Sequence, residues 1–306
     1  MDIFKNTKAT LLNIRNFHSI THNVTEEVIS IVGAQTFFDN NFQKGVCEKK
    51  CNSEEIIVSL TSFGIRAYNV YLTISSLMHQ SYKVNRIILW LSEKEFSSSK
   101  LPATLVKLQA LGLEVKFYKD IKSFKKLIPT LQESPQTTII TVDDDIIYPY
   151  IFIEQMVINH RRHPNEVLFT RGHRIKFNKK KSMILPYRSW FWNVKEFNCA
   201  SLCLFPTGCG GVLYPPNCFH SDILNEEKFM SLTPTADDIW FKVMTVLNNV
   251  KCRQIEISHQ LVTISNTQSH SLSSSNNGIV NRNDIQLNKI IEAYPEFLSI
   301  LLKEKI

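Results

Sequence analysis

Residues 137–145 read TTIITVDDD, a run of apolar and β-branched residues that ends in the consecutive acids Asp143, Asp144 and Asp145. A continuous run of this kind favours a strand that is buried on both faces, as the strands of a parallel sheet are. In an open parallel sheet, ligands bind beyond the carboxyl ends of the strands. The stretch therefore predicts a central strand with a ligand site at its end.

Strand-like and helix-like segments alternate on both sides of this run. Before it, the apolar pattern predicts strands at 56–61, 86–91 and 113–118 and helices at 70–78, 101–111 and 124–131. After it, the pattern predicts a helix at 151–160, one or two strands at 166–177, a strand at 208–216, a helix at 236–247, a strand at 250–257 and a helix at 284–302. Such alternation predicts an α/β fold whose mostly parallel sheet is flanked by helices. It fails between residues 178 and 207, where we expect irregular structure.

The length and composition of the chain indicate how it is organised into domains. With 306 residues and 43% hydrophobic content, the sequence predicts one sizeable core. We expect an N-terminal extension over 1–52, the main domain over 53–260, and a C-terminal loop and helix over 261–306 that pack on the same domain. The seven cysteines, an odd number, favour free thiols. Because the sequence has no apolar run of about 20 residues and no secretory pattern, we expect a soluble cytoplasmic protein.

The acidic run predicts a divalent cation site. Three adjacent carboxylates repel one another and would destabilise the fold if they were buried without a cation. Mg²⁺ and Mn²⁺ prefer hard oxygen ligands and often take one or two carboxylates together with substrate phosphates. Alternation of side chains would point Asp143 and Asp145 the same way and turn Asp144 toward the backbone or a neighbour. The alternative is an acidic turn or helix cap before Ile146.

Two further charged segments are candidates for the same site. Asp237 and Asp238 open a predicted helix, where the helix dipole alone would favour acids. The lysine-rich segment 120–129 precedes another helix, whose free N–H groups attract anions, although a solvated lysine face explains it as well. A basic cluster over 171–181 could meet nucleic acid, anionic lipid or a phosphorylated substrate, or could be a solvated loop.

Five segments taken together resemble bacterial glycosyltransferases of the GT-A type. They are Val58 to Phe63 with Arg66, Ile87 to Ser92, Asp120 to Pro129, Thr141 to Asp145, and Thr235 to Trp240. The resemblance covers about residues 55–260 and implies a Rossmann-like, nucleotide-binding GT-A fold with an irregular acceptor-side region. It also implies that the Asp-x-Asp motif binds Mn²⁺ or Mg²⁺, which bridges the diphosphate of a nucleotide-sugar donor.

The resemblance implies a role for each matching residue. Asp145 would be the main metal ligand, and Asp143 would contact the metal, a metal-bound water or the donor ribose. The donor would also be bound by Thr61, Arg66, Asp120, Asp144 and Lys126, with Lys122 and Lys125 competing for the role of Lys126. Asp238, beside Asp237, would be the general base of an inverting enzyme. A late histidine completes the metal shell in some relatives, and His270 is the candidate here.

The resulting expectation is a metal-dependent hexosyltransferase that uses a UDP-linked sugar. Its acceptor would be a bacterial surface glycan or a lipid-linked glycan, with peripheral contact to the inner membrane and no nucleic-acid partner. The alternatives are a metal-dependent phosphatase or nucleotidyltransferase, and a non-enzymatic protein that binds nucleic acid or an anionic membrane. Trp190 and Trp192 could stack on sugar rings or pack in the core.

Overall fold

The central sheet has eight strands in the order β3-β2-β1-β4-β10-β6-β11-β8. Its strands are β1 (Ile56–Thr61), β2 (Arg86–Ser92), β3 (Leu113–Tyr118), β4 (Thr138–Thr141), β6 (Val167–Phe169), β8 (Ala200–Ser201), β10 (Val212–Tyr214) and β11 (Cys252–Gln254). Strands β3, β2, β1 and β4 are parallel neighbours, β6 and β11 are parallel to each other, and β10 lies antiparallel between β4 and β6. The mostly parallel sheet predicted from the sequence is confirmed, with β10 and β8 reversed.

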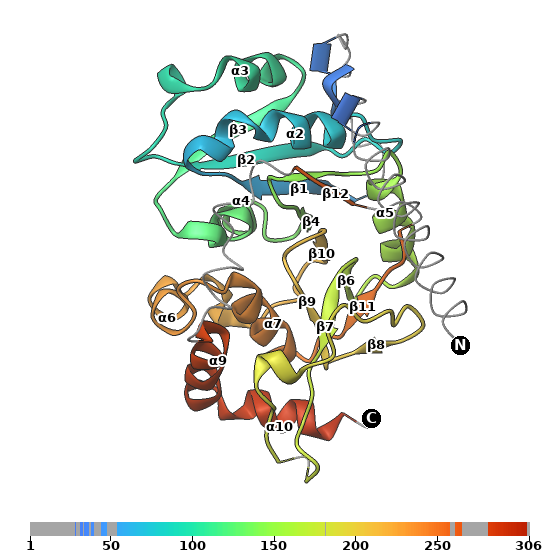
Figure 1. Cartoon of the computed structure of the whole chain (residues 1–306), viewed down its shortest axis with the longest axis vertical. Helices are drawn as coiled ribbons and strands as arrows, with labels where there is room; N and C mark the ends of the chain where they lie inside the picture. Colours follow the sequence, from blue (N-terminus) through green and yellow to red (C-terminus); the bar gives the residue numbers. More distant parts are fainter. Residues whose placement is uncertain are drawn as a thin grey trace, which may run out of the picture.

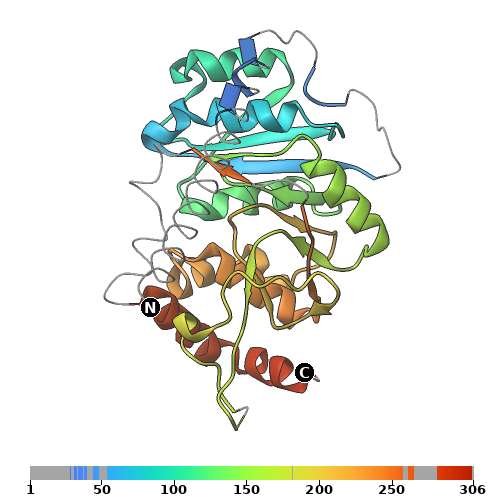
Figure 2. The same cartoon turned by 45° about the vertical axis from the view of Figure 1, so that its right-hand side comes forward.

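The computed structural model describes most of the chain. The described residues are Val28, 31–32, 34–36, 38–39, 44–47, 54–180, 182–257, 261–264 and 281–304. The helices are α2 (Val70–Met78), α3 (Ala103–Ala110), α4 (Ile128–Glu133), α5 (Phe152–Arg162), α6 (Glu226–Leu232), α7 (Asp237–Leu247), α9 (Arg282–Ala293) and α10 (Pro295–Lys303). Helices α2 and α3 lie over strands β1 to β3, while α6, α7, α9 and α10 gather at the opposite end of the molecule (Figures 1 and 2).

The sheet is buried on both faces, and each face has its own hydrophobic cluster. Val58, Leu60 and Leu89 pack with α2 and α3, whereas Ile139 and Val212 pack with the aromatic face of α7. Residues on both sides of the pleat are therefore apolar, which explains why these strands read as continuous apolar runs. This packing fixes the position of every strand end that contributes to the cavity described below.

Strand β1 lies at the point where the order of the sheet reverses. The chain moves from β1 to β2 and β3 in one direction, whereas β4 pairs with the other edge of β1. In doubly wound sheets, the crevice outside the carboxyl ends of two such strands is where ligands bind. The two strand ends at this crevice are Thr61 of β1 and Thr141 of β4, and the acidic run directly follows the latter.

Several elements differ from the predictions. The expected single C-terminal helix over 284–302 is two helices, because Pro295 begins α10 and cannot donate the hydrogen bond that would continue α9. The region 178–207, expected to be irregular, contains β8 and also β9 (Leu204–Pro206), which pairs with β7 (Gly172–Arg174). Directly after the acidic run, β5 (Ile146–Ile147) pairs with β12 (Val262–Thr263).

Described residues of the segment 1–52 lie against the main sheet domain. Ala34 packs with Ile147, and the amide of Gly45 donates a 2.8 Å hydrogen bond to the carbonyl of Leu111. Cys47 is disulfide-bonded, so the expectation of free thiols is wrong for this residue. Free thiols are found at Cys199, Cys203, Cys209, Cys218 and Cys252. Within the part of the chain that the structure describes, no helix combines the length and apolarity needed to cross a membrane.

Candidate functional site

A cavity of about 640 Å³ opens at the carboxyl ends of β1 and β4. One wall is formed by the exit of β1, the acidic run and the 3-10 helix Lys122–Lys126 (η3). The other wall is formed by residues next to β7, by Gly208 and Cys209 before β10, and by the first turn of α7. The cavity therefore brings together the acidic run, the lysine-rich segment and the second acid pair, which are far apart in the sequence.

Asp144 is the most constrained member of the acidic run. It is 7% exposed and accepts a 2.6 Å hydrogen bond from Ser62 Oγ and a 3.1 Å hydrogen bond from Arg66 Nε. A second guanidinium nitrogen of Arg66 contacts its other carboxylate oxygen. The side chain of Asp144 thus points toward neighbouring residues, as the alternation of side chains predicted. Its carboxylate oxygens link the residues that follow β1 to the residues that follow β4.

Arg66 also reaches Asp145. A guanidinium nitrogen lies 3.0 Å from Asp145 Oδ2, and Arg66 is only 8% exposed, so it is a buried cation of the cavity wall and not a surface charge. Burial raises the pKa of Asp145, and the nearby guanidinium opposes this only in part. In the half-buried carboxylate of Asp145, burial thus has a larger effect on the pKa than the charge of Arg66.

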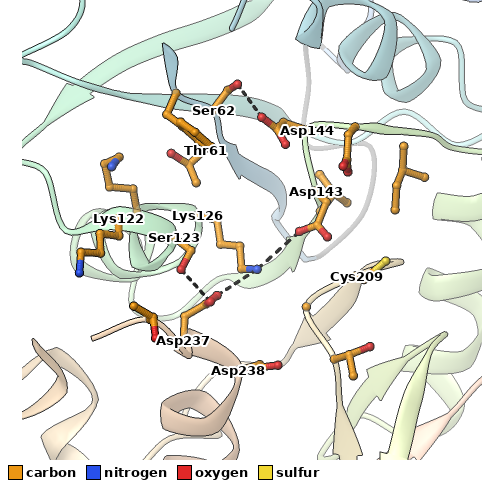
Figure 3. A pocket seen from close by; sticks show the side chains of 18 of the residues that line it. Thr61, Ser62, Lys122, Ser123, Lys126, Asp143, Asp144, Cys209, Asp237 and Asp238 are labelled. Atoms are coloured by element: carbon orange, nitrogen blue, oxygen red, sulfur yellow. Dashed lines mark hydrogen bonds and ion pairs between the residues drawn. The ribbon is translucent and has the colours of Figure 1, made fainter. Parts of the chain in front are cut away.

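Lys126 occupies the space between two acids. Its Nζ lies 2.9 Å from Asp237 Oδ2 and 3.5 Å from Asp143 Oδ1, and Figure 3 shows the side chain pointing between them. Burial alone would lower the pKa of Lys126, but the carboxylates of Asp237 and Asp143 raise it above its ordinary value. Burial raises the pKa of Asp143 to about 6, against the effect of Lys126.

Lys122, Lys125 and Lys126, the three candidates for the donor-binding lysine, have different positions. Lys125 is buried and pairs at 2.6 Å with Asp120, which lies at the rim of the cavity. Lys122 donates to the carbonyl of Pro234 at 3.1 Å. Of the three, Lys126 is therefore the one whose charge faces the acidic run.

Asp237 and Asp238 are the first residues of α7 and face the cavity. Ser123 Oγ donates a 2.7 Å hydrogen bond to Asp237, which fixes this acid together with Lys126. Asp238 is half-buried, and burial together with the charge of Asp237 raises its pKa to about 7. Asp238 faces the same space from the start of α7 (Figure 3). Its carboxylate can therefore gain or lose a proton near neutral pH.

Gly208 gives Lys126 the room to reach the two acids. A Cβ atom built on Gly208 would lie 2.5 Å from Lys126 Nζ. Gly210 and Gly211, in the same turn, have φ values of 98° and 101°, which favour glycine because a side chain would be strained there. The glycine-rich segment 208–211 therefore permits a close approach between the backbone and the cavity.

The charges lining the cavity do not balance. The cavity is lined by seven acids, Glu95, Asp120, Asp143, Asp144, Asp145, Asp237 and Asp238, and by five cations, Arg66, Lys122, Lys125, Lys126 and Arg171. Among the described residues, no group of three or more histidine, cysteine, aspartate or glutamate side chains is arranged to hold a metal ion. Asp143 and Asp145 nevertheless fit a Mg²⁺ or Mn²⁺ ion that takes its other ligands from phosphate oxygens and water. His270 lies outside the described residues.

The basic cluster over 171–181 is divided among several environments. Arg174 pairs with Glu196, Lys176 lies over the ring of Phe191, and Arg171 lines the cavity. His173 is 2% exposed, and burial lowers its pKa to about 4. Among the described residues of the cluster, the cationic side chains therefore do not form one continuous surface for an anionic polymer.

Sequence reasoning assigned no individual role to several residues that line the cavity or contact its acids. Ser62 and Ser123 hold Asp144 and Asp237, and Tyr148 accepts a 3.0 Å hydrogen bond from the amide of Asp143. His173 and Tyr187 contribute to the cavity wall from the region expected to be irregular. Only Ser62 carried a local signal, because it directly follows the strand that ends at Thr61.

No family model and no curated protein matches the sequence. Among solved structures, S. aureus TarS 1-349 in complex with UDP-GlcNAc is similar with a TM-score of 0.50 and 13% identity, over 81% of this chain and 71% of that chain. The mannosyltransferase PcManGT from Pyrobaculum calidifontis, in complex with GDP-Man and Mn²⁺, has a TM-score of 0.46 and 10% identity, over 92% of this chain and 82% of that chain. CMP:2-keto-3-deoxy-manno-octonic acid synthetase, complexed with CTP, has a TM-score of 0.39 and 10% identity, over 72% of this chain and 98% of that chain.

At such identities a likeness concerns the fold alone, and the TM-score with TarS is 0.50. The chain has a GT-A-like α/β fold, as the resemblance in the sequence implied. Fold does not by itself assign an activity, since function depends on the residues of the site.

Proposed function

We propose that this chain is a metal-dependent glycosyltransferase that moves a sugar from a nucleotide donor to an acceptor hydroxyl. The observation that carries the proposal is the meeting of Asp143, Asp145, Lys126 and Asp238 in one cavity, at the point of the GT-A-like sheet where the strand order reverses. This combination provides both a phosphate-binding side and a proton acceptor. UDP as the nucleotide, and a glycan or lipid-linked acceptor at the inner membrane, follow from the resemblance of the sequence.

The charge of the cavity supports the need for a divalent cation. A diphosphate is an anion, and it would enter a cavity in which seven acids outnumber five cations. Asp143 and Asp145 would hold Mg²⁺ or Mn²⁺, which neutralises the diphosphate and stabilises it as a leaving group. Thr61 and the first turn of the 3-10 helix Gly64–Tyr68 would border the nucleoside.

The acceptor side of the reaction needs a base. Asp238 would accept the proton of the acceptor hydroxyl while that oxygen attacks the anomeric carbon. The bond between the anomeric carbon and the donor phosphate oxygen breaks, and its electron pair leaves with the nucleoside diphosphate. Attack opposite the leaving group inverts the anomeric carbon. Lys126 would keep Asp143 and Asp237 in a fixed relation during this step.

A thermal-shift panel tests the proposal first. Nucleotide sugars with different bases are added with Mn²⁺ or with EDTA, and a donor that binds the folded state raises the melting temperature by mass action. We expect a UDP-sugar to stabilise the protein only with Mn²⁺, and turnover of that donor to be lost in Asp145→Ala. The matched control is Glu292→Ala, an exposed acid of α9 that does not line the cavity, and it should retain turnover.

Assays of product release with the same protein distinguish the other enzyme classes. Release of inorganic phosphate from phosphomonoesters would indicate a phosphatase, and release of pyrophosphate from a nucleoside triphosphate and a sugar would indicate a nucleotidyltransferase. Either result, without turnover of any nucleotide sugar, would overturn the proposal. So would full turnover by Asp145→Ala.

A further inference from the structure

Trp192 differs from the other tryptophans in its exposure. Its side chain is 42% exposed and lines the cavity, whereas Trp90, Trp190 and Trp240 are 3%, 4% and 0% exposed. A large aromatic surface left open to water loses the free energy that burial would supply. An aromatic ring that stays exposed beside polar groups in a cavity is typical of a binding surface.

The ring of Trp192 packs against two buried side chains. It lies 4.6 Å from the ring of His173 at an interplanar angle of 31°, and 5.5 Å from Tyr187 at 79°. His173 and Tyr187 are 2% and 5% exposed, so the support is part of the core. Burial keeps His173 neutral at physiological pH, because it lowers the pKa of this residue to about 4.

The backbone that follows Trp192 is also held in place. The amide of Asn193 donates a 3.1 Å hydrogen bond to His173 Nδ1, which places the ring proton of the neutral imidazole on Nε2. Asn193 has a φ of 47°, and its side-chain oxygen accepts a 3.0 Å hydrogen bond from Arg171 Nε. The residues around Trp192 therefore specify one orientation of the ring.

The position of Trp192 in the cavity assigns it to the acceptor side. The donor wall is built from the ends of β1 and β4, whereas Trp192 belongs to the wall beside β7. Tyr187, which contacts Trp192, has a pKa raised first by burial and next by the charge of Asp238. Trp192 and Asp238 line the same cavity, so a group placed on Trp192 would share that cavity with the proposed base.

We propose that Trp192 is a stacking platform for a pyranose ring of the acceptor, and that His173 and Tyr187 position it. A pyranose presents an apolar face of C–H groups that can pack on an indole ring, while its hydroxyl groups at the edge remain available to polar partners. The ligand class is thus a carbohydrate. The inference rests on the proposed glycosyltransferase function for the role of the bound sugar, but not for the binding itself.

Tryptophan fluorescence tests the binding without any donor. Because three of the four tryptophans are buried, acrylamide should quench mainly Trp192 in the native protein. Methyl β-glucoside, methyl β-galactoside and methyl β-N-acetylglucosaminide are the probes, and glycerol at the same concentration is the control. We expect at least one glycoside to lower the quenching constant toward that of Trp192→Phe. Equal quenching with all three glycosides and with glycerol would overturn the proposal.

Kinetics of a purified transferase reaction test the role of the platform. Trp192→Ala should raise the acceptor KM by about 10-fold, which corresponds to roughly 1.4 kcal/mol and is within the range of one aromatic contact. Its rate of donor hydrolysis by water should fall much less than its rate of transfer. The matched control is Phe191→Ala, because Phe191 is 51% exposed but does not line the cavity. An unchanged acceptor KM, or equal losses of hydrolysis and transfer, would contradict the platform.

The outcomes separate this inference from the proposed function. If no nucleotide sugar binds but a glycoside protects Trp192, the glycosyltransferase proposal fails and the sugar platform stands. If a donor turns over but no glycoside protects Trp192 and the acceptor KM of Trp192→Ala is normal, only the platform fails. Because the quenching experiment uses the native protein, it remains decisive even if Trp192→Ala does not fold.

Discussion

The ammonium group of Lys126 lies 2.9 Å from a carboxylate oxygen of Asp237, so a residue of η3 is ion-paired with the first residue of α7. Both side chains are almost fully buried, at 8% and 9% exposure. The same ammonium group is 3.5 Å from Asp143, in the loop after β4. One buried cation therefore links the proposed metal side of the cavity to the element that carries the proposed base.

Replacing Lys126 with methionine should destabilise the fold, because it leaves Asp143 and Asp237 without their cation. Removing one partner of a buried ion pair typically costs about 3–5 kcal/mol. Urea unfolding measures the loss, and Lys125→Met is the matched control. Lys125 is just as buried, but its partner Asp120 is 43% exposed and can be hydrated by water instead. Equal stabilities of the two variants would show that Lys126 does not carry this charge compensation.

The rate of sugar transfer should depend on the protonation of Asp238. Because burial and Asp237 raise its pKa to about 7, kcat/KM is expected to rise with pH and to level off above neutrality. Asp238→Asn should lower transfer by about 10²–10⁴-fold, the usual contribution of a general base. Asp222→Asn, which alters an acid outside the cavity, is the control. A flat pH profile with an active Asp238→Asn enzyme would exclude Asp238 as the base.

Asp238 should also affect how stability changes with pH. Its pKa is raised in the folded state from 3.8 to about 7, so below pH 3.8 the group is protonated whether or not the chain is folded. As pH rises from 3.8 to about 7, Asp238 loses its proton in the unfolded state but keeps it in the folded state. The free energy of unfolding therefore falls over this pH range. Asp238→Asn should therefore be more stable than the native protein at pH 8, by about 1–3 kcal/mol, and similar to it near pH 3.5.

Chemical unfolding in EDTA at the two pH values measures this difference. The sign is the decisive quantity: if Asp238→Asn is less stable than the native protein at pH 8, the carboxylate is compensated by neighbours and its pKa is not raised.

Gly208→Ala should impair activity more than stability. The added methyl group would come within 2.5 Å of Lys126 Nζ, which is the far end of a flexible side chain and can move aside. Moving it lengthens the contacts with Asp143 and Asp237, so we expect transfer to fall by about 10-fold, as for the loss of one positioning contact. Gly64→Ala should instead impair stability more than activity. Its φ of 50° would cost an alanine about 1–2 kcal/mol of stability, whereas the added Cβ would meet nothing within 4 Å. A normal rate for Gly208→Ala would contradict the proposed positioning by Lys126.

Asp144 and Asp145 should behave differently although they are neighbours. Asp144→Asn weakens the hydrogen bonds to Ser62 and Arg66, and we expect a loss of about 1.5–3 kcal/mol in unfolding free energy. Asp145→Asn should instead abolish the Mn²⁺-dependent stabilisation by a UDP-sugar. Calorimetry with and without Mn²⁺ separates the two effects. If Asp144→Asn also abolishes the Mn²⁺ dependence without a loss of stability, Asp144 is a ligand and not a structural acid.

The α/β architecture was predictable because its signal is local. Strands buried on both faces are continuous apolar runs, and β1 to β4 were therefore found within a few residues of their observed bounds. The position of the acidic run was predictable for the same reason, since it directly follows such a strand. The division of the last helix at Pro295 was also visible in the sequence but was missed.

The partners of the charged residues were not predictable from the sequence. The acidic run was expected to need a cation from outside the chain, whereas Arg66, 78 residues earlier, holds Asp144 in the structure. The choice among Lys122, Lys125 and Lys126 depended on which way each side chain leaves η3. Neither relation is a property of a short window of sequence.

From the amino-acid sequence one could predict the order of the main strands and helices, the acidic run after a strand and the acid pair at the start of a helix. Three relations became visible in the folded chain alone: these acids share one cavity, Trp190 is buried while Trp192 is exposed, and Gly208 leaves space for Lys126. The difference lies in the range of the interactions. Periodicity reflects burial within one element, whereas ion pairs and cavities depend on how elements distant in the chain pack against one another.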